Sequence, residues 1–295
     1  MATRDGQWWD ATWSPVTGCQ ADYPCWQRCW ARSMCTRYAK QWHLDPTEPF
    51  TPTFHEDWLE TPLHWKKPRV VFCCAMGDLF AEGVKKEWQD AVFCTIATSI
   101  RHTYVLLTKR PDRLCDYIEA PISIKRPWRL KGPGLAQCPV VFPNLVIGTS
   151  VSTQAEWDER VPVLCRIPAW RRIVSVEPCL GEIETGRLGG DILCDGCDMM
   201  MGVQGQAHEI FGEPGDPPEL CGYGRLWPAI HGIICGGETG PGARPMDLQW
   251  ARDLRDQCKA AGVCFFMKQL DKKQPIPQDL MIRQLCWTKE PSSGD

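Results

Sequence analysis

The chain alternates short apolar runs with longer amphipathic stretches along most of its length. Six runs are rich in β-branched and aromatic residues, and a polar or glycine-containing break follows each. They span 69–76, 103–108, 144–151, 171–176, 229–235 and 263–267. Their apolar residues are consecutive, which is typical of parallel strands covered on both faces. A weaker run, 11–18, comes before them and predicts a further strand.

The stretches between these runs predict helices. They cover 26–42, 85–100, 152–167 and 246–262. The third opens with Ser152 and Thr153, which favour a helix start, and the fourth ends at Gly262, which favours a helix end. Strand and helix therefore alternate, and this order predicts an α/β fold whose parallel sheet is open or curled into a full or partial barrel.

Two segments break this pattern. Residues 182–228 form an insertion rich in Gly and Pro, and its part 182–220 holds nine acidic residues against one basic residue. Residues 271–295 form a polar C-terminal tail. We therefore expect an α/β body made of 1–181 and 229–270.

Composition narrows the class of protein further. An apolar fraction of 43% is typical of a globular chain. The formal charge of −3 argues against a strongly basic protein that coats nucleic acid. We expect no membrane association, because no apolar run reaches the roughly 18 residues that a spanning helix needs. The first residues show no apolar export signal, so we expect a cytoplasmic protein with reduced thiols.

Polar residues follow the apolar runs at the points where the predicted strands end. In parallel sheets the carboxyl ends of the strands meet at one edge, where active sites lie. We therefore expect one polar rim, although ordinary solvation of loop ends is the alternative. Its candidate residues are Gly77, Asp78, Lys109, Arg110, Ser150, Ser175, Glu177, Glu238 and Lys268.

The 18 cysteines fall into two kinds. Most lie inside apolar runs, where free cysteine acts as a small core residue. By contrast, Cys19, Cys25 and Cys29 cluster just after the first predicted strand, with five and three residues between them. Three thiolates suit an iron–sulfur cluster that leaves one iron open. Zinc, with Cys35 or a histidine as fourth ligand, and purely structural thiols remain alternatives.

Two further features bear on ligands. Cys194 and Cys197 resemble half of a zinc knuckle inside the insertion, with Cys221 and His208 as partners, although a loop without metal is the alternative. Residues 101–131 hold eight basic against three acidic residues, which suits phosphate groups of nucleotides or nucleic acid. A solvated helix and loop would give the same pattern.

Six blocks of sequence resemble a phage- and prophage-borne family. They are GCQADYPCWQRCWARSM, CCAMGDLF, LLTKRPDRL, IGTSVSTQAEWDERVPVL, IVSVEPCLG and GGETGPGARPMDLQWARDLRDQCKAAGVCFFMKQ. That family looks like a divergent branch of the radical S-adenosylmethionine (SAM) superfamily, near spore photoproduct lyase. The resemblance covers most of 8–181 and 229–270. It implies a partial (β/α) barrel of the radical SAM type, with an inserted loop-rich segment.

The resemblance also implies cofactors and roles. A [4Fe–4S] cluster would be held by Cys19, Cys25 and Cys29, whose spacing departs from the tighter one usual in the superfamily. Its open iron would bind SAM, and one electron from a flavodoxin- or ferredoxin-like protein would cleave SAM to methionine and a 5′-deoxyadenosyl radical. Gly77 and Asp78 occupy the place of the segment that binds the SAM amino group. Trp30, directly after Cys29, would pack on the cluster, on adenine or in the core.

The remaining rim residues divide by charge. Ser150, Ser175 and Glu177 are candidates for the SAM ribose or carboxylate. For an anionic substrate the candidates are Lys109, Arg110, Glu238, Arg244 and Lys268. The leading hypothesis is a radical SAM enzyme acting on nucleotides or nucleic acid. The alternatives are a non-catalytic, metal-stabilised phage protein that binds nucleic acid or acts as an adaptor, and a barrel enzyme without a cluster.

Overall fold

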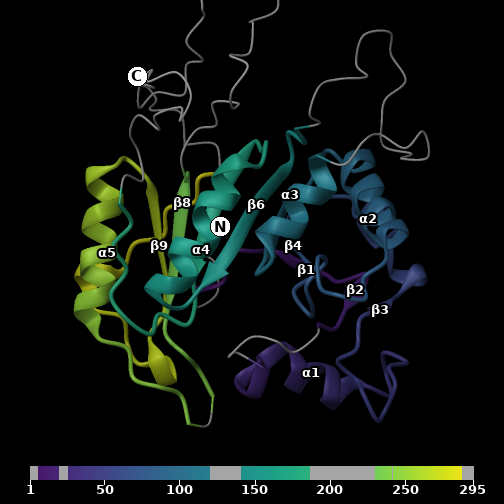
Figure 1. Ribbon diagram of the computed structural model, residues 1–295, viewed down its shortest axis with the longest axis horizontal. Helices are drawn as coiled ribbons and strands as arrows, with labels where there is room; N and C mark the ends of the chain where they lie inside the picture. The colour runs from purple at the N-terminus through teal and green to yellow at the C-terminus, as the bar shows by residue number, and fades with distance from the viewer. Residues whose placement is uncertain (1–5, 20–25, 120–140, 187–229, 241, 288–295) are drawn as a thin grey trace, which may run out of the picture. The chain divides into compact units, whose positions relative to one another are not determined.

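The computed structural model describes residues 6–19, 26–119, 141–186, 230–240 and 242–287 (Figure 1). It divides into two units. The first consists of Met1–Ser150 with Ala169–Arg171, and the second of Val151–Pro168 with Arg172–Asp295. The two units are taken separately below.

The first unit is built on parallel strands that follow one another in chain order. Their order is β1-β4-β5-β6, and every pair between neighbours is parallel. The strands are β1 (Ala11–Trp13), β4 (Val70–Cys73), β5 (Thr103–Thr108) and β6 (Leu145–Val151). Within β5 and β6, Tyr104, Leu106 and Val146 are buried, so these strands form part of the core. The prediction of consecutive apolar strands is confirmed here.

Three helices accompany these strands, and two of them confirm the pattern. They are α1 (Trp30–Tyr38), α2 (Lys86–Thr98) and α3 (Pro111–Glu119). Helix α2 buries Val92, Phe93 and Ile96 along one face. Phe93 stacks on Tyr117 of α3, with ring centroids 5.1 Å apart. Short 3-10 turns η2 (Trp26–Arg28), η3 (Glu56–Trp58) and η4 (Thr61–His64) complete the unit.

The predicted strand 11–18 is in fact two short strands. Residues 11–13 form β1, whereas β2 (Val16–Thr17) pairs antiparallel with β3 (Thr53–Phe54). Pro15 lies between β1 and β2, and proline has no N–H to donate to a ladder. Its carbonyl oxygen instead accepts a hydrogen bond from His55 N at 2.8 Å. The chain therefore leaves the parallel sheet at Pro15.

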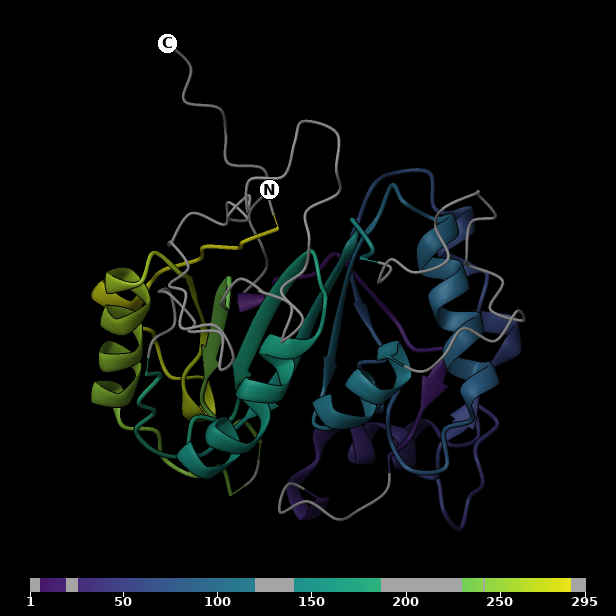
Figure 2. The same ribbon diagram turned by 45° about the horizontal axis from the view of Figure 1, so that its top comes forward.

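The second unit repeats the parallel pattern with three strands. Their order is β7-β8-β9, again parallel and in chain order. The strands are β7 (Arg171–Val176), β8 (Gly232–Gly236) and β9 (Cys264–Gln269). Two helices, α4 (Gln154–Arg166) and α5 (Leu248–Ala260), belong to the same unit, and α5 packs against β8 and β9 (Figure 2). The short turns η5 (Asp271–Lys273) and η6 (Gln278–Leu280) follow β9.

Both units confirm an α/β protein with parallel strands. Part of the predicted tail packs on β9, because Met267 N donates to Ile282 O at 2.9 Å and Leu280 is fully buried. The predicted insertion lies outside the described residues from 187 to 229, and with it lie Cys194, Cys197, His208 and Cys221. None of the helices in the described part of the chain has the length and apolar character that crossing a bilayer requires.

Candidate functional site

Two glycines bring the first cysteine of the cluster next to the end of β4. Gly18 and Gly77 form a parallel bridge, in which Gly18 N donates to Met76 O at 2.9 Å and Asp78 N donates to Gly18 O at 3.2 Å. A Cβ on Gly77 would overlap the Gly18 carbonyl oxygen. Gly18 itself has φ +86°, a region that favours glycine. The close approach of these backbones places Cys19 and Asp78 side by side.

Arg110 joins these two residues from the next strand. It follows the end of β5, and its Nη1 lies 3.3 Å from Cys19 Sγ and 3.2 Å from Asp78 Oδ2. Its backbone N also donates to Thr108 Oγ1 at 3.0 Å, which fixes the turn after β5. The side chains of Arg110 and Asp78 are both 8% exposed. The result is a buried ion pair with a thiol at one end, which we call the thiol–arginine cluster (Cys19, Asp78 and Arg110).

Cys29, at the start of α1, packs against the same apolar group as Cys19. Cys29 is the N-cap residue of α1, with an extended backbone, and its side chain makes no capping hydrogen bond. Cys19 and Cys29 both pack against one apolar group, formed by Ala31, Cys35, Leu44 and Phe50. Cys19 N donates to Phe50 O at 2.8 Å, which ties the loop after β2 to this group. Two of the three predicted ligands therefore contact the same apolar wall.

The ionisation of these thiols reflects their surroundings. Burial raises the pKa of Cys19, the Asp78 carboxylate raises it further, and Arg110 acts in the opposite direction. Burial raises the pKa of Cys35 to about 11. The Cys35 thiol donates a hydrogen bond to Met76 O, with Sγ and O 3.6 Å apart. Cys35 is therefore held as a neutral core residue. Of these two thiols, only Cys19 has a cation beside its sulfur.

The predicted metal site also requires Cys25. This residue lies outside the described residues. In the part of the chain that is described, no three Cys, His, Asp or Glu side chains come together in a way that could hold a metal ion. Cys19 and Cys29 nevertheless fit an iron–sulfur cluster, because they are soft sulfur donors beside one apolar wall and flank the segment that carries Cys25.

The second unit holds a separate polar group after β7. Lys268 Nζ lies 2.7 Å from Glu177 Oε1, and Ser175 Oγ donates to Glu177 Oε2 at 2.8 Å. A Cβ on Gly236 would come 2.8 Å from Glu177 Oε1, so the glycine at the end of β8 makes room for this carboxylate. Three predicted rim residues, Ser175, Glu177 and Lys268, are thus brought together within one unit.

Glu238 and Arg244 form a second pair in the same unit. Arg244 Nη2 donates to Glu238 Oε1 at 2.7 Å, and Arg244 Nε donates to Glu238 Oε2 at 3.0 Å. The backbone N of Arg244 also donates to Glu238 Oε2, at 2.9 Å. This forked geometry closes the glycine-rich turn after β8. Glu238 therefore binds an arginine of its own chain in this structure.

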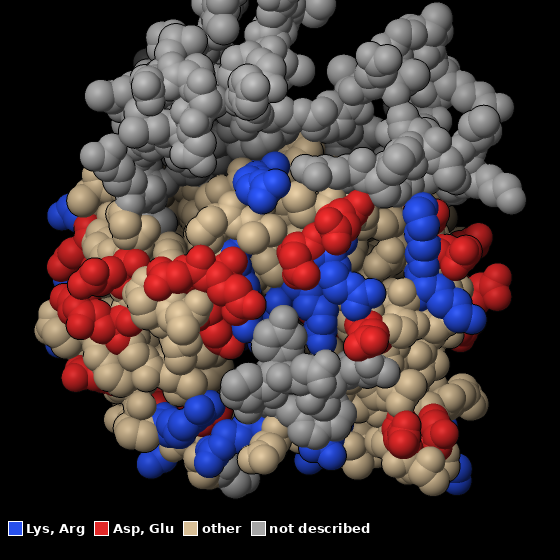
Figure 3. All heavy atoms as spheres, viewed as in Figure 1, with Lys and Arg blue, Asp and Glu red and all other residues tan. Residues whose placement is uncertain are grey.

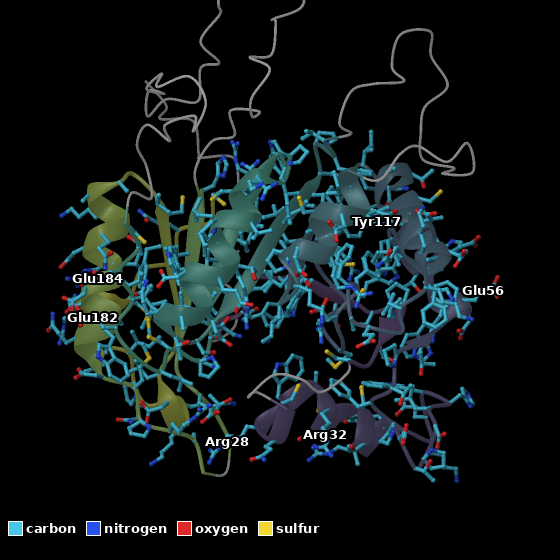
Figure 4. All side chains as sticks on the ribbon, viewed as in Figure 1. Arg28, Arg32, Glu56, Tyr117, Glu182 and Glu184 are labelled. Atoms are coloured by element: carbon cyan, nitrogen blue, oxygen red, sulfur yellow. The ribbon has the colours of Figure 1, made fainter. Side chains whose placement is uncertain are left out.

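The surface beside α1 is basic and carries an exposed tryptophan. Residues 26–44 hold Arg28, Arg32, Arg37 and Lys40 but no acidic residue. Arg28 and Arg32 lie on the side of α1 that faces away from the β-strands of the first unit (Figure 4). Trp30 is 55% exposed, so its ring is not packed in the core. Trp30 and Arg37 are two helical turns apart and lie on one face. We call these residues, Arg28, Trp30, Arg32, Arg37 and Lys40, the α1 surface.

The second unit presents the opposite charge. A recess is lined by Gln154, Asp158, Glu182, Glu184 and Gly186. Gln154 Nε2 donates to Asp158 Oδ1 at 2.7 Å, and its Oε1 accepts from Glu184 N at the same distance. Acidic side chains gather over this part of the molecule, where Glu182 and Glu184 lie beside α5 (Figures 3 and 4). Anionic ligands are disfavoured here because carboxylates line the recess.

A family model matches residues 4–283 and describes a protein of unknown function, DUF5131. The chain belongs to the DUF5131 family. No curated protein and no solved structure matches it. Since the match covers both units, the thiol–arginine cluster and the Glu177–Lys268 pair both lie within the region that defines this DUF5131 protein.

The structure also describes two other predicted site residues, Lys109 and Ser150. Lys109 follows β5, is half-buried, and donates its backbone N to Asp78 Oδ2 at 3.0 Å. Ser150 lies near the end of β6 and is half-buried. Sequence reasoning missed the contact of Arg110 with Cys19 and the pairing of Lys268 with Glu177. The only signal available was the position of each residue just after or at the end of a strand.

Proposed function

We propose that this protein is a radical SAM enzyme with an iron–sulfur cluster held by Cys19, Cys25 and Cys29. The observation that carries the proposal is that Cys19 and Cys29 both pack against one apolar group, with Cys19 directly after the Gly18–Gly77 bridge. The parallel, chain-order strands of both units support a partial (β/α) barrel of the radical SAM type. The resemblance of the cysteine segment to that superfamily supports the choice of metal.

The chain's own residues have distinct tasks in this proposal. The apolar group of Ala31, Leu44 and Phe50 keeps water away from the sulfur atoms. Gly18 and Gly77 fix the position of Cys19. When bound, the reduced cluster would supply one electron that breaks the bond between sulfur and C5′ of SAM, giving methionine and a 5′-deoxyadenosyl radical.

The direct test is reductive cleavage of SAM. Protein purified and reconstituted without oxygen, then reduced with dithionite or with a reduced flavodoxin, should contain iron and sulfide and release 5′-deoxyadenosine from SAM. Iron-free protein carried through the same steps is the control and should release none. A reconstituted protein that binds iron and sulfide but leaves SAM intact would contradict the proposed SAM cleavage. The proposed metal site would still stand. Protein without iron would contradict both.

We also propose a nucleotide-containing substrate, and single-stranded nucleic acid is the form that the α1 surface favours. Residues 26–44 carry four basic and no acidic residues, a local charge that attracts phosphates even though the whole chain carries −3. The exposed ring of Trp30 offers a base a stacking partner. This surface equally favours the second candidate function, a metal-stabilised protein that binds nucleic acid without catalysis. The two functions differ in the SAM cleavage test.

Replacing Trp30 by alanine tests the α1 surface. Stacking of one base is worth about 1–3 kcal/mol, so the Kd for a short labelled oligothymidylate should rise roughly tenfold. Fluorescence anisotropy measures the change. Ile100→Ala is the matched control, because Ile100 is also an exposed apolar residue of the first unit. Equal affinity of Trp30→Ala and wild type, or tighter binding of duplex than of single strands, would contradict this docking mode.

A further inference from the structure

Arg110 lies between a sulfur atom and a carboxylate. Its Nη1 is 3.3 Å from Cys19 Sγ and 3.2 Å from Asp78 Oδ2. A guanidinium Nη carries two hydrogens, so one N–H can point at each acceptor. Arginine keeps its charge in proteins, and hydrogen bonds from a charged donor are stronger than neutral ones. The sulfur of the first predicted iron ligand therefore has a permanent cationic donor beside it.

Asp78 has no acceptor position left over for a ligand. Its Oδ1 accepts from Phe80 N at 2.9 Å and from Thr108 Oγ1 at 2.8 Å. Its Oδ2 accepts from Lys109 N at 3.0 Å and from Arg110 Nη1 at 3.2 Å. A carboxylate offers about four lone-pair positions, and the chain's own donors fill all of them. This geometry suits a residue that holds Arg110 and the turn after β5 better than one that binds the SAM amino group.

We propose that Arg110 is a positioning residue that hydrogen-bonds the iron-ligating sulfur of Cys19, and that Asp78 holds Arg110 in place. This role rests on the proposed function. Hydrogen bonds to ligating sulfur are one of the factors that set the reduction potential of an iron–sulfur cluster. Reduction adds one negative charge, which a nearby cation favours. Arg110 therefore makes the cluster easier to reduce.

The experiment measures the midpoint potential of the reconstituted protein by a redox titration followed in visible absorbance. Arg110→Met removes the donor and the charge, and the potential should become more negative, with iron content retained. Arg110→Lys restores a charge and should bring the potential back toward that of wild type. Asp78→Asn removes an anion, which by itself would make the potential less negative. A shift toward more negative potential, as in Arg110→Met, is therefore the result expected if Asp78 holds Arg110 beside Cys19, and a shift in the opposite direction would overturn that part of the proposal. Arg101→Met, at an exposed position of the same unit, should leave it unchanged.

The outcomes separate this role from the proposed function. A potential that stays at the wild-type value in iron-loaded Arg110→Met would overturn the positioning role and leave the radical SAM proposal standing. A wild-type protein that takes up no iron would overturn both. Asp78→Asn also loses contacts to the turn after β5, so thermal unfolding is recorded alongside. If that variant does not fold, the Met and Lys variants at position 110 decide the question by themselves.

Discussion

Replacing Cys19, Cys25 or Cys29 singly by alanine will reduce iron from about four atoms per chain to background after anaerobic reconstitution. The physical reason is that a four-iron cluster with one open iron has only three protein ligands, so the loss of any one leaves two iron atoms exposed to solvent. Iron and sulfide analysis together with visible absorbance measures the change.

The controls for this experiment come from the same chain. Cys35 is fully buried in the apolar group that Cys19 and Cys29 contact, and its thiol lies near the Met76 carbonyl oxygen. Cys94 lies on α2 and is half-buried. Cys35→Ala and Cys94→Ala should therefore keep their iron. Loss of metal in Cys35→Ala as well as in the three ligand variants would favour a four-cysteine zinc site. Iron retained in all three ligand variants would overturn the assignment of Cys19, Cys25 and Cys29 as the cluster ligands.

The second large effect is expected at Gly77. Alanine at this position would overlap the Gly18 carbonyl oxygen and come 2.8 Å from Gly18 N, both of which are backbone atoms. Because backbone atoms of a paired strand end cannot move aside as a flexible side chain can, Gly77→Ala should lower the free energy of unfolding by about 3 kcal/mol. Urea denaturation measures this loss. The same variant should also weaken iron loading, because the Gly18–Gly77 bridge places Cys19.

A matched glycine provides the control for the stability effect. A Cβ on Gly181 would meet no atom within 4 Å, and Gly181 has no positive φ. Gly181→Ala should therefore change the free energy of unfolding by no more than about 0.5 kcal/mol. If Gly77→Ala were equally neutral, the tight bridge between Gly18 and Gly77 would not be an essential contact of the folded protein.

The parallel strands could be predicted because their apolar runs are consecutive and separated by helices. The split at Pro15 could have been anticipated from the missing N–H of proline, whereas the pairing of β2 with β3 depends on a contact between distant residues. Helix α3, nine residues long, was not among the predicted helices. Its one local signal was Pro111 at the first helical position.

The candidate site was predictable residue by residue but not as a set of contacts. Strand ends identified Asp78, Arg110 and Cys19 separately. The contact between Arg110 and Cys19 joins residues 91 positions apart, and no local pattern specifies it. The same holds for Lys268 in β9 and Glu177 directly after β7, which form an ion pair. Exposure of Trp30 also needed the structure, because a tryptophan on a short helix packs in the core or faces solvent with the same sequence pattern.

The electron paramagnetic resonance spectrum of the reduced protein, recorded with and without SAM, tests the central claim most directly. A cluster held by three cysteines leaves one iron free for SAM, so the account predicts an iron–sulfur signal that changes shape when SAM is added. Cys35→Ala should show the same change, and Cys29→Ala should show no signal. A wild-type signal that is identical with and without SAM, or no iron–sulfur signal at all, would contradict the account.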